Sequence, residues 1–514
     1  MCFVVASNEI SVQPTVIAEK DLRLRRIGID THRESIAFLD NNDLLGRTLG
    51  LHPLDRVQVS ANGRTVLAVL NTVENTVLKE GWIGLSNMAF ERLGACENAV
   101  VDVVPAEPPA SAELLRAKMS GSELTSAEIG AIVEDIVCGR FSKVELTAFV
   151  VSAKVFGLTD DEITGLINAM VNTGQRLHFG AQLVADKHCT GGVPGNRTTP
   201  IVVSIIAAAG LLIPKTSSRS ITSPAGTADT METIMNVELT ADRIYQTVRT
   251  ANGCLAWGGG LNLAPADDML IQVEHPLNID VEGLMISSIL AKKKAAGSTH
   301  ILLDIPYGTG TKADTKEKAV HLKERFAKLA SRLGLTVQVV LTDGSQPIGN
   351  GIGPVLEARD VMKVLRNETD APPDLREKSI QLAAELLELT GQCPGNAWDL
   401  AHNLLTSGKA LEKFQTIQKT QGPRECPPVG THVKTIVSHR SGKICSINNK
   451  VIGRVALLAG APNNAGAGVQ LAAHVNDFRD PGDPLFTIYS DSEEALAYAT
   501  RHWQANQSLG IVIS

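Results

Sequence analysis

Apolar and polar positions along the first hundred residues follow the pattern of strands. Leu22 to Ile27 nearly alternates, as does Val57 to Val59, whereas Val66 to Leu70 is a continuous apolar run typical of a more buried strand. Asn62-Gly63, between the last two runs, favours a tight hairpin turn. The arginines of the first run fit a solvated strand face better than a docking face. We therefore expect a small β-rich domain followed by a proline-rich linker.

From Thr125 the apolar period becomes 3.6 residues. Thr125–Glu128 and Thr159–Glu162 each have the spacing of a capping box, which marks the start of a helix. Between residues 180 and 420 short apolar runs alternate with helical segments, and the runs include Leu183–Ala185, Ile301–Ile305 and Val337–Leu341. This alternation indicates an α/β domain with a mainly parallel sheet.

Strands return after a second linker at residues 424–428. They include Pro484–Tyr489, and they indicate a C-terminal α+β domain. The uncharged run at 198–214 is short for a membrane span and fits a buried helix. Without a basic-then-apolar leader at the N-terminus, we expect a soluble cytoplasmic protein that does not bind membranes.

Composition narrows the class of protein. The 514 residues are 44% hydrophobic and 20% charged, which excludes a disordered chain. The net charge of −7 and the 4% of aromatic residues argue against a nucleic-acid polymer as partner. The eight cysteines include no CxxC pair, which excludes a zinc ribbon or a thioredoxin-type site at the level of motifs.

The segment at 186–199 concentrates candidate chemistry. It reads DKHCTGGVPGNRTT and places a strand, a glycine-rich loop and an apolar helix in succession. Glycines let backbone N–H groups approach an anion, and a helix N-terminus favours negative charge. Lys187, Arg197 and the threonine hydroxyls add donors. The segment matches neither the P-loop nor the dinucleotide fingerprint, and its glycines alone fit a phosphate site or a structural turn equally well.

Three more segments are rich in donors and poor in carboxylates, namely 215–227, 287–294 and 306–312. Ser288 and Lys292 lie four apart and share a helix face, although a lysine triplet by itself is typical of a solvated face. Together the segments predict a site for one or two phosphate groups. No metal-binding constellation accompanies them, so we expect no metal, and phosphate acts as a nucleophile rather than in magnesium-assisted phosphoryl transfer.

These segments together resemble the thymidine phosphorylase family, and most closely its long-form branch with AMP phosphorylase. The stretch DKHCTGG resembles the family's phosphate signature DKHSTGG. The branch resemblance lies in Gly192–Thr198, Lys215–Thr230, Ser288–Lys293, Thr342–Gly349 and the β-rich N-terminal extension. The match covers about 110–490 in order.

The resemblance implies an α/β protein with the two-lobe nucleoside phosphorylase fold, in which a helical lobe and an α/β lobe flank a closing cleft. It also implies a homodimer or larger homo-oligomer. The expected domains are an N-terminal β-rich domain at 1–105, a helical lobe at 110–178 with 265–297, an α/β phosphate-binding lobe at 180–262 with 298–424, and a C-terminal α+β domain at 425–514.

The implied activity is that of a pentosyltransferase acting by phosphorolysis on small molecules. Inorganic phosphate, a co-substrate, attacks C1′ of a ribosyl compound, and a free base leaves without help from a cofactor. The oxocarbenium-like sugar needs an anion held beneath it, and the departing base needs a proton or a hydrogen bond.

By position, the resemblance assigns phosphate binding to Lys187, Cys189, Thr190, Thr198, Thr199, Ser217 and Thr227. It assigns nucleotide binding to Gly192, Ser218, Arg219, Ser220, Ile221, Thr222, Ser223, Thr227, Ser288, Lys292 and Lys312. Asp280 matches the branch's proton donor to the base, and His188 matches an acid of the short enzymes.

Two expectations concern ionisation. Asp280 stands between apolar Ile279 and Val281, so we expect burial to raise the pKa of its carboxyl into the range of a useful acid. Cys189 replaces the usual serine and is a weaker donor, which predicts a modest loss of phosphate affinity or compensation by Thr190. Its electropositive loop favours the thiolate.

The substrate is the least constrained part of the prediction. Short family members recognise thymine with a Tyr and an Arg, and the corresponding stretch Leu270–Glu274 has neither. The hydroxyl and arginine donors at 218–223 and Lys312 favour a second phosphate group on the substrate. We therefore expect a nucleoside 5′-monophosphate such as AMP, which is cleaved to free base and ribose 1,5-bisphosphate. Alternatives are a pyrimidine nucleoside phosphorylase that yields thymine and 2-deoxyribose 1-phosphate, a magnesium-dependent activity like that of anthranilate phosphoribosyltransferase, and a non-catalytic nucleotide sensor.

Overall fold

Two compact units make up the chain. The computed structural model describes residues 22–31, 34–220, 223–393 and 395–514. The first unit comprises the residues up to Arg116 together with Asp135–Phe149, and the second comprises Ala117–Glu134 together with Val150–Ser514.

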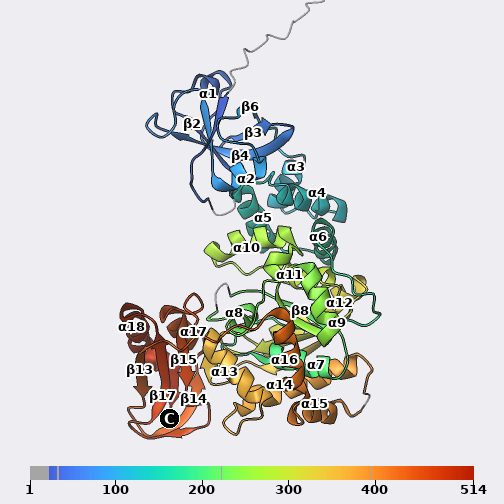
Figure 1. Ribbon diagram of the computed structural model, residues 1–514, viewed down its shortest axis with the longest axis vertical. Coiled ribbons are helices and arrows are strands. Elements are labelled where there is room, and N and C mark those ends of the chain that lie inside the picture. Colours follow the sequence, from blue (N-terminus) through green and yellow to red (C-terminus); the bar gives the residue numbers. More distant parts are fainter. Residues whose placement is uncertain (1–21, 32–33, 221–222, 394) are drawn as a thin grey trace, which may run out of the picture. The chain divides into compact units, whose positions relative to one another are not determined.

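A closed barrel dominates the first unit and is blue in Figure 1. Its strands are β1 Leu22–Arg26, β2 Ile36–Asp40, β3 Arg56–Ala61, β4 Arg64–Val73, β5 Trp82–Leu85 and β6 Val100–Pro105, joined by the short helices α1 Leu44–Thr48 and α2 Asn87–Leu93. They lie in the order β1-β5-β2-β4-β3-β6. Buried and partly exposed positions alternate along β3, because inward-facing side chains fill a small barrel. Asn62 and Gly63, with φ of 51° and 75°, form the predicted hairpin turn between β3 and β4.

Helices follow the barrel and include both predicted capping boxes. They are α3 Ala112–Met119, α4 Ser126–Val137, α5 Lys143–Phe156 and α6 Asp160–Thr173. At the start of α6 the Glu162 N–H donates to Thr159 Oγ1 over 3.3 Å, and the Thr159 N–H donates to Glu162 over 2.8 Å. Thr125 and Glu128 form the same pair of bonds before α4. Two later helices, α10 Pro265–Leu277 and α11 Glu282–Ala295, pack against α6.

An α/β part occupies the middle of the second unit. Its strands are β7 Ala185–Cys189, β8 Ile213–Ser217, β9 Gly253–Trp257, β10 His300–Tyr307 and β11 Thr336–Asp343. Its helices are α7 Thr198–Ala208, α8 Thr227–Glu232, α9 Ala241–Ala251, α12 Lys316–Arg332, α13 Pro354–Leu365, α14 Pro373–Leu389, α15 Ala397–Thr406 and α16 Lys409–Gln421. The sheets β11-β10-β7 and β8-β9 are parallel, as predicted.

The predicted buried helix at 198–214 is right as far as Ala208. α7 is apolar and buried around almost its whole circumference, and α14, α15 and α16 pack on it. The chain then turns at Gly210, with φ of 90°, and enters β8 at Ile213. The strand expected at Leu183–Ala185 begins instead at Ala185.

One side chain covers the outer edge of β9. Gln421, at the end of α16, accepts the Leu255 N–H over 2.8 Å and donates to the Leu255 carbonyl over 3.0 Å. Its amide also donates to the Asn236 carbonyl over 2.7 Å. Both backbone groups of Leu255 are therefore satisfied without another strand.

The C-terminal part is α+β, as predicted. Its strands are β13 His432–Val437, β14 Gly442–Ile447, β15 Gly468–Leu471, β16 Phe478–Arg479, β17 Pro484–Ser490 and β18 Ile511–Ile513, and its helices are α17 Asn449–Leu458 and α18 Glu493–Gly510. β12, at Gly351–Ile352, joins the sheet β12-β15-β17-β13. Phe486 and Trp503 meet edge to face in the core, with ring centroids 4.7 Å apart. No helix in the described part of the chain is long and apolar enough to cross a membrane.

Candidate active site

The carboxyl ends of parallel strands position the predicted phosphate segments. β7 ends at Cys189 and β8 at Ser217, and the two strands pack beside each other. A glycine-containing loop follows each strand and leads into α7 or α8. Open α/β sheets bind ligands at this edge, where helix N-termini face the strand ends.

Gly192 brings two of the predicted loops into contact. Its φ is 92°, and a Cβ at this position would lie 2.7 Å from Thr311 Cα and 3.0 Å from the Lys312 nitrogen. Only glycine accommodates both the backbone angle and this close approach. The loop after β7 therefore packs directly on the 308–312 loop, which carries Lys312.

Lys187 is fully buried, and its side chain reaches the N-terminus of α7. Its ammonium lies 2.8 Å from Thr198 Oγ1 and 3.4 Å from Thr199 Oγ1. Burial lowers the pKa of Lys187, and the carboxylate of Asp304, 3.9 Å away, opposes that shift. The structure thus brings together a lysine, two hydroxyls and a helix N-terminus, all of which the sequence assigns to phosphate.

The loop after β7 holds polar atoms without partners. Cys189 Sγ accepts from the Gly191 N–H over 3.4 Å and from the Asn196 amide over 3.5 Å. Within the described residues, the Thr190 hydroxyl and the Asn196 Oδ1 are buried without a hydrogen bond. Buried polar atoms are nearly always satisfied, so an unpaired hydroxyl here supports a ligand that completes the loop.

The expectation of a thiolate at Cys189 is wrong. Burial raises the pKa of this thiol to about 11, and the carboxylate of Asp304 adds to the effect. Lys187 and Lys378 act in the opposite direction but do not outweigh burial. Cys189 is therefore a thiol at neutral pH, and its S–H, which hydrogen-bonds Asp304, would have to turn from that carboxylate to serve phosphate as a weak donor.

Beneath the loop lies a buried cluster of charges. Asp186 is 3.3 Å from Lys215 and 2.9 Å from Lys293, and Ser298 donates to it over 3.1 Å. Burial alone would raise the pKa of Asp186, but the two lysines hold it below its ordinary value. Burial lowers the pKa of Lys215 to about 7.

A second aspartate continues the cluster. Asp304 on β10 lies 3.4 Å from Lys378 of α14 and accepts from Thr342 over 2.6 Å. Lysines at 187, 215, 293 and 378 thus face two aspartates in a buried region. Sequence reasoning missed Asp304 and Lys378, and the solvated face proposed for the lysine triplet is wrong for Lys293, which is only 3% exposed.

His188, which follows Lys187 on β7, is a neutral imidazole because of its burial and these lysines. Burial lowers its pKa well below the usual value, and Lys215, Lys293, Lys187 and Lys292 lower it further. At neutral pH it can donate a hydrogen bond from one ring nitrogen, whereas an imidazolium acid would need a bound anion to offset the lysines.

Arg197 and Glu357 fix the start of α7 against α8 and α13. Arg197 Nε lies 2.6 Å from Glu357, and its Nη1 donates to Thr227 over 3.0 Å. Thr230 also donates to Glu357, over 3.2 Å. The N-termini of α7 and α8 are therefore held together by a carboxylate that sequence reasoning missed.

The loop between β8 and α8 differs from its prediction. Arg219 pairs with Glu232, with Glu238 at 2.9 Å and with Asp229 at 3.5 Å, and its guanidinium lies 4.8 Å from the Trp257 ring centre. The stretch itself contains few carboxylates, but the fold brings carboxylates from later residues close to it. Arg219 is therefore not a free donor for a nucleotide.

The hydroxyls of the same loop mostly bond within it. Ser220 donates to the Ser223 carbonyl, Ser223 donates to the Ala225 carbonyl over 3.2 Å, and Ser217 donates to the Ala256 carbonyl over 3.3 Å. The Ser218 carbonyl accepts the Ala228 N–H over 3.4 Å. Ile221 and Thr222 lie outside the described residues.

Ser288 and Lys292 share a face of α11, as predicted, and both meet Asp267 of α10. Ser288 donates to Asp267 over 2.8 Å, and Lys292 lies 2.6 Å from Asp267 and 3.2 Å from Asp268. Burial opposes the charge of Lys292, but the two aspartates prevail and raise its pKa. Lys292 is a permanent cation held by carboxylates.

Asp280 is not buried, contrary to the expectation. Its side chain is 78% exposed and forms an ion pair with Lys312, and its carbonyl accepts from Lys154 over 2.8 Å. The apolar neighbours Ile279 and Val281 do not enclose it. The structure does join Asp280 and Lys312, both of which the resemblance assigns to the nucleotide.

Glu274 is a carboxyl that sequence reasoning missed. Burial raises its pKa to about 7, Asp267 and Asp280 add to the rise, and Lys312 and Lys292 oppose it. Its position ends the stretch Leu270–Glu274, in which the short enzymes have a Tyr and an Arg. The absence of that Tyr and Arg was the one signal in the sequence that could have drawn attention to Glu274.

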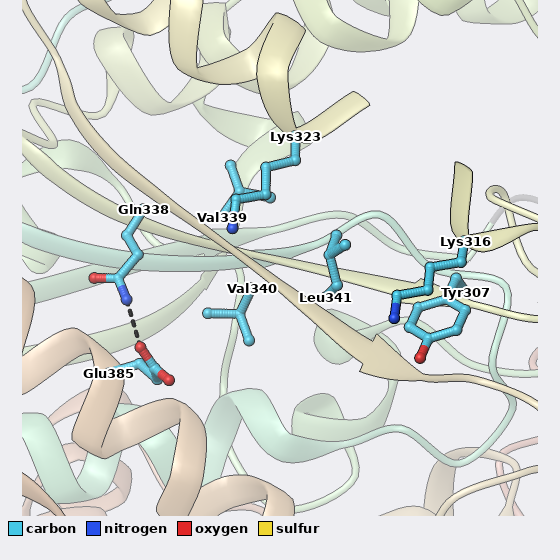
Figure 2. Close-up of a pocket in the computed structure, with 8 residues that line it drawn as sticks. All are labelled: Tyr307, Lys316, Lys323, Gln338, Val339, Val340, Leu341 and Glu385. Carbon is cyan, nitrogen blue, oxygen red and sulfur yellow. Dashed lines mark hydrogen bonds between the residues drawn. The ribbon is translucent and has the colours of Figure 1, made fainter. Parts of the chain in front are cut away.

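A separate open groove follows the edge of β11 (Figure 2). Gln338 to Leu341 line it, together with Tyr307 of β10, Lys316 and Lys323 of α12, and Glu385 of α14, which hydrogen-bonds Gln338. None of the residues assigned to phosphate or nucleotide lines this groove.

Three parts of the chain match known domain families. Residues 112–174 match the helical bundle domain and residues 181–411 the a/b domain of a glycosyl transferase family, and residues 443–510 match a pyrimidine nucleoside phosphorylase C-terminal domain. Fold and site thus define a glycosyltransferase with the two-lobe nucleoside phosphorylase fold, which confirms the predicted fold class.

Relatives extend the match over nearly the whole chain. A protein of Methylococcus capsulatus named "Putative thymidine phosphorylase" is 46% identical over 482 residues, 93% of each chain, and one of Rhodopseudomonas palustris with the same name is 44% identical over 493 residues, 95% of this chain and 96% of that protein. The chain belongs to the thymidine phosphorylase family.

A solved structure shows how widely this fold is shared. Anthranilate phosphoribosyltransferase from Thermus thermophilus matches with a TM-score of 0.51 and 18% identity, over 60% of this chain and 98% of that one. At this identity the likeness concerns the fold alone.

Proposed function

We propose that the enzyme catalyses phosphorolysis of nucleoside 5′-monophosphates, AMP among them, and releases free base and ribose 1,5-bisphosphate. One observation carries the proposal: the buried excess of lysines over aspartates around Lys187, at the N-terminus of α7, beside the unpaired Thr190 hydroxyl. Buried charges need compensation, and a phosphate dianion would provide it.

In this proposal phosphate binds between Lys187, Thr198 and Thr199, with Cys189 and Thr190 as additional donors. A phosphate oxygen attacks C1′, the C1′–N bond breaks, and the base leaves with the electron pair and takes up a proton. Holding the anion in place supplies orientation and charge stabilisation at once. The reaction needs no cofactor.

Support for a 5′-phosphate comes from Lys312. Its side chain is 38% exposed, and its backbone packs on Gly192 of the phosphate loop, so a second phosphate on the substrate could reach it. The residues at 270–274 offer no Tyr or Arg for thymine. Asp280, the proton donor implied by the resemblance, is exposed and paired with Lys312, which leaves room for another carboxyl in that role.

A second candidate is phosphorolysis of thymidine, because the relatives are named for that activity. As part of the proposal we expect the enzyme to act in the cytoplasm as a homodimer or larger homo-oligomer.

A base-release assay tests the proposal. The wild type is incubated with AMP, CMP, UMP, adenosine, uridine and thymidine, each with and without inorganic phosphate, and free base is quantified. We expect phosphate-dependent release with the highest kcat/KM for a monophosphate. If thymidine or uridine is cleaved at least as efficiently as every monophosphate, the second candidate replaces the first. Release that ignores phosphate would contradict both.

A further inference from the structure

Glu274 occupies a distinctive place on α10. It lies seven residues after Asp267, so the two share a face of the helix about 10 Å apart. Its side chain is half-buried. Within the described residues, no side chain hydrogen-bonds or forms an ion pair with its carboxyl. Its oxygens are not among the buried unsatisfied atoms of the described residues, so water or a ligand can reach them.

The neighbours of Glu274 are residues assigned to base and nucleotide. α10 and α11 form a helical hairpin, in which Asp267 near the start of α10 meets Ser288 at the middle of α11 and Lys292 one turn later. The connection between the helices carries Asp280, which pairs with Lys312. Glu274 therefore lies between these two contacts along the hairpin.

Burial and two neighbouring carboxylates raise the pKa of Glu274 toward neutrality. Burial is the largest cause of its raised pKa of about 7, and Asp267 on its own helix and Asp280 on the connection add to it. Lys312 and Lys292 face it from the 308–312 loop and from α11, and lower it. The protonated and the ionised carboxyl are therefore both accessible near neutral pH.

We propose that Glu274 contacts the departing base and delivers the proton that the base takes up. This rests on the phosphorolysis proposed above. As the phosphate oxygen bonds to C1′ and the C1′–N9 bond of AMP breaks, the electron pair enters the purine, and the Glu274 proton passes to N7. Neutral adenine leaves, and the carboxylate is reprotonated from water.

Glu274 suits this role better than Asp280. The Asp280 carboxylate is solvent-exposed and has an ammonium partner, whereas Glu274 is half-buried and, in the described part of the chain, has no side-chain partner. Lys292 lowers the pKa of both Glu274 and His188 of β7, so the two side chains share a charged neighbour.

Glu274→Gln, which keeps the shape but cannot release a proton, is the decisive variant. Its kcat/KM for AMP is measured against pH from 5 to 9 beside the wild type and a control, Glu324→Gln, which removes an exposed carboxylate of α12. We expect a loss of roughly a hundredfold or more at pH 6, the usual scale for a general acid. We also expect the wild-type advantage to shrink about tenfold per pH unit above 7, because the acid form disappears there.

A second substrate separates chemistry from structure. N7-methylated AMP already carries a positive purine that leaves without protonation, so Glu274→Gln should cleave it nearly as fast as the wild type does. Thermal unfolding at pH 8 checks the fold, and removal of a partly buried, unpaired charge should leave the midpoint unchanged or raised. Equal losses on both substrates, or an unchanged pH profile, would overturn the proposal.

The same variant keeps the two proposals distinguishable. If the wild type releases no base from AMP but cleaves thymidine, the proposed substrate fails. The pH profile of thymidine phosphorolysis, wild type against Glu274→Gln, then decides the role of Glu274. If the wild type cleaves AMP and Glu274→Gln matches it at every pH, phosphorolysis stands and Glu274 is excluded.

Discussion

The strand β7 and the hairpin of α10 and α11 arrange charge in opposite ways. Around β7, lysines outnumber aspartates, and nearly every member of the cluster is buried. On the hairpin the carboxyls at 267, 268, 274 and 280 outnumber their partners Lys292 and Lys312. The β7 region lacks an anion, whereas the hairpin has an excess of carboxyls, and the pKa of one of them, Glu274, is raised to about 7.

That difference matches the two halves of a displacement. In the proposed reaction the nucleophile would bring negative charge to β7, and the leaving base would take its proton from the hairpin. A site with the same sign of charge throughout would stabilise either the attacking phosphate or the leaving base, but not both. The contrast therefore supports phosphorolysis more than either cluster does alone.

The largest effect should come from Lys187→Met, which removes the buried ammonium at the start of α7. Each charge-assisted hydrogen bond contributes about 1.5–3 kcal/mol, so the loss of two such bonds to phosphate should lower kcat/KM for phosphate roughly a thousandfold. Initial rates at varied phosphate concentration measure this. Lys318→Met, at an exposed position on α12, serves as the control. A loss no larger than that of the control would mean that the buried lysine does not hold phosphate.

Lys312→Met should have the next largest effect and should act on the other half of the contrast. If Lys312 binds the 5′-phosphate, the ratio of kcat/KM for AMP to that for adenosine should fall roughly ten- to a hundredfold, the equivalent of one charge-assisted bond. Parallel assays of the two substrates measure the ratio. Equal losses for AMP and adenosine would place Lys312 outside 5′-phosphate recognition.

Alkylation of Cys189 tests the electrostatics of the β7 loop. Because burial raises the pKa of the thiol to about 11, the thiolate fraction and the alkylation rate should rise about tenfold per pH unit between 7 and 10. Phosphate should slow the reaction by occupying the loop. Mass spectrometry of the Cys189 peptide follows the rate, and a plateau below pH 9 would show that the thiolate prevails after all.

Arg219→Met should have the smallest effect on catalysis. Glu232, Glu238 and Asp229 hold the guanidinium, so its loss should change the AMP-to-adenosine ratio by less than about fivefold, under ~1 kcal/mol. Thermal unfolding of the same variant reports the lost ion pairs. A large fall in the ratio would restore Arg219 as a nucleotide donor.

Sequence patterns predicted the fold well because its signals are local. The capping boxes at Thr125 and Thr159, the turn at Asn62-Gly63 and the parallel strands at 301–305 and 337–341 each follow from a few adjacent residues. The order of segments then supplied the family.

The site was predicted less completely, because burial and partners depend on distant residues. The neighbours of Asp280 are apolar, yet its side chain faces solvent and meets Lys312. Arg219 looked unpaired, yet Glu238 reaches it from nineteen positions along the chain. Lys378 and Asp304 carry no motif and become visible only when α14 packs against β10.

The side-chain amide of Gln421 occupies the backbone groups that a further strand would bond at the edge of β9. A free sheet edge is a template on which another chain can add a strand, and β9 would offer the N–H and carbonyl of Leu255 for that purpose. With both groups occupied by one amide, the edge is closed to such pairing. Resistance of this protein to aggregation during heating should thus depend on a residue far from any chemistry, with Gln421→Ala forming aggregates at a lower temperature than the wild type.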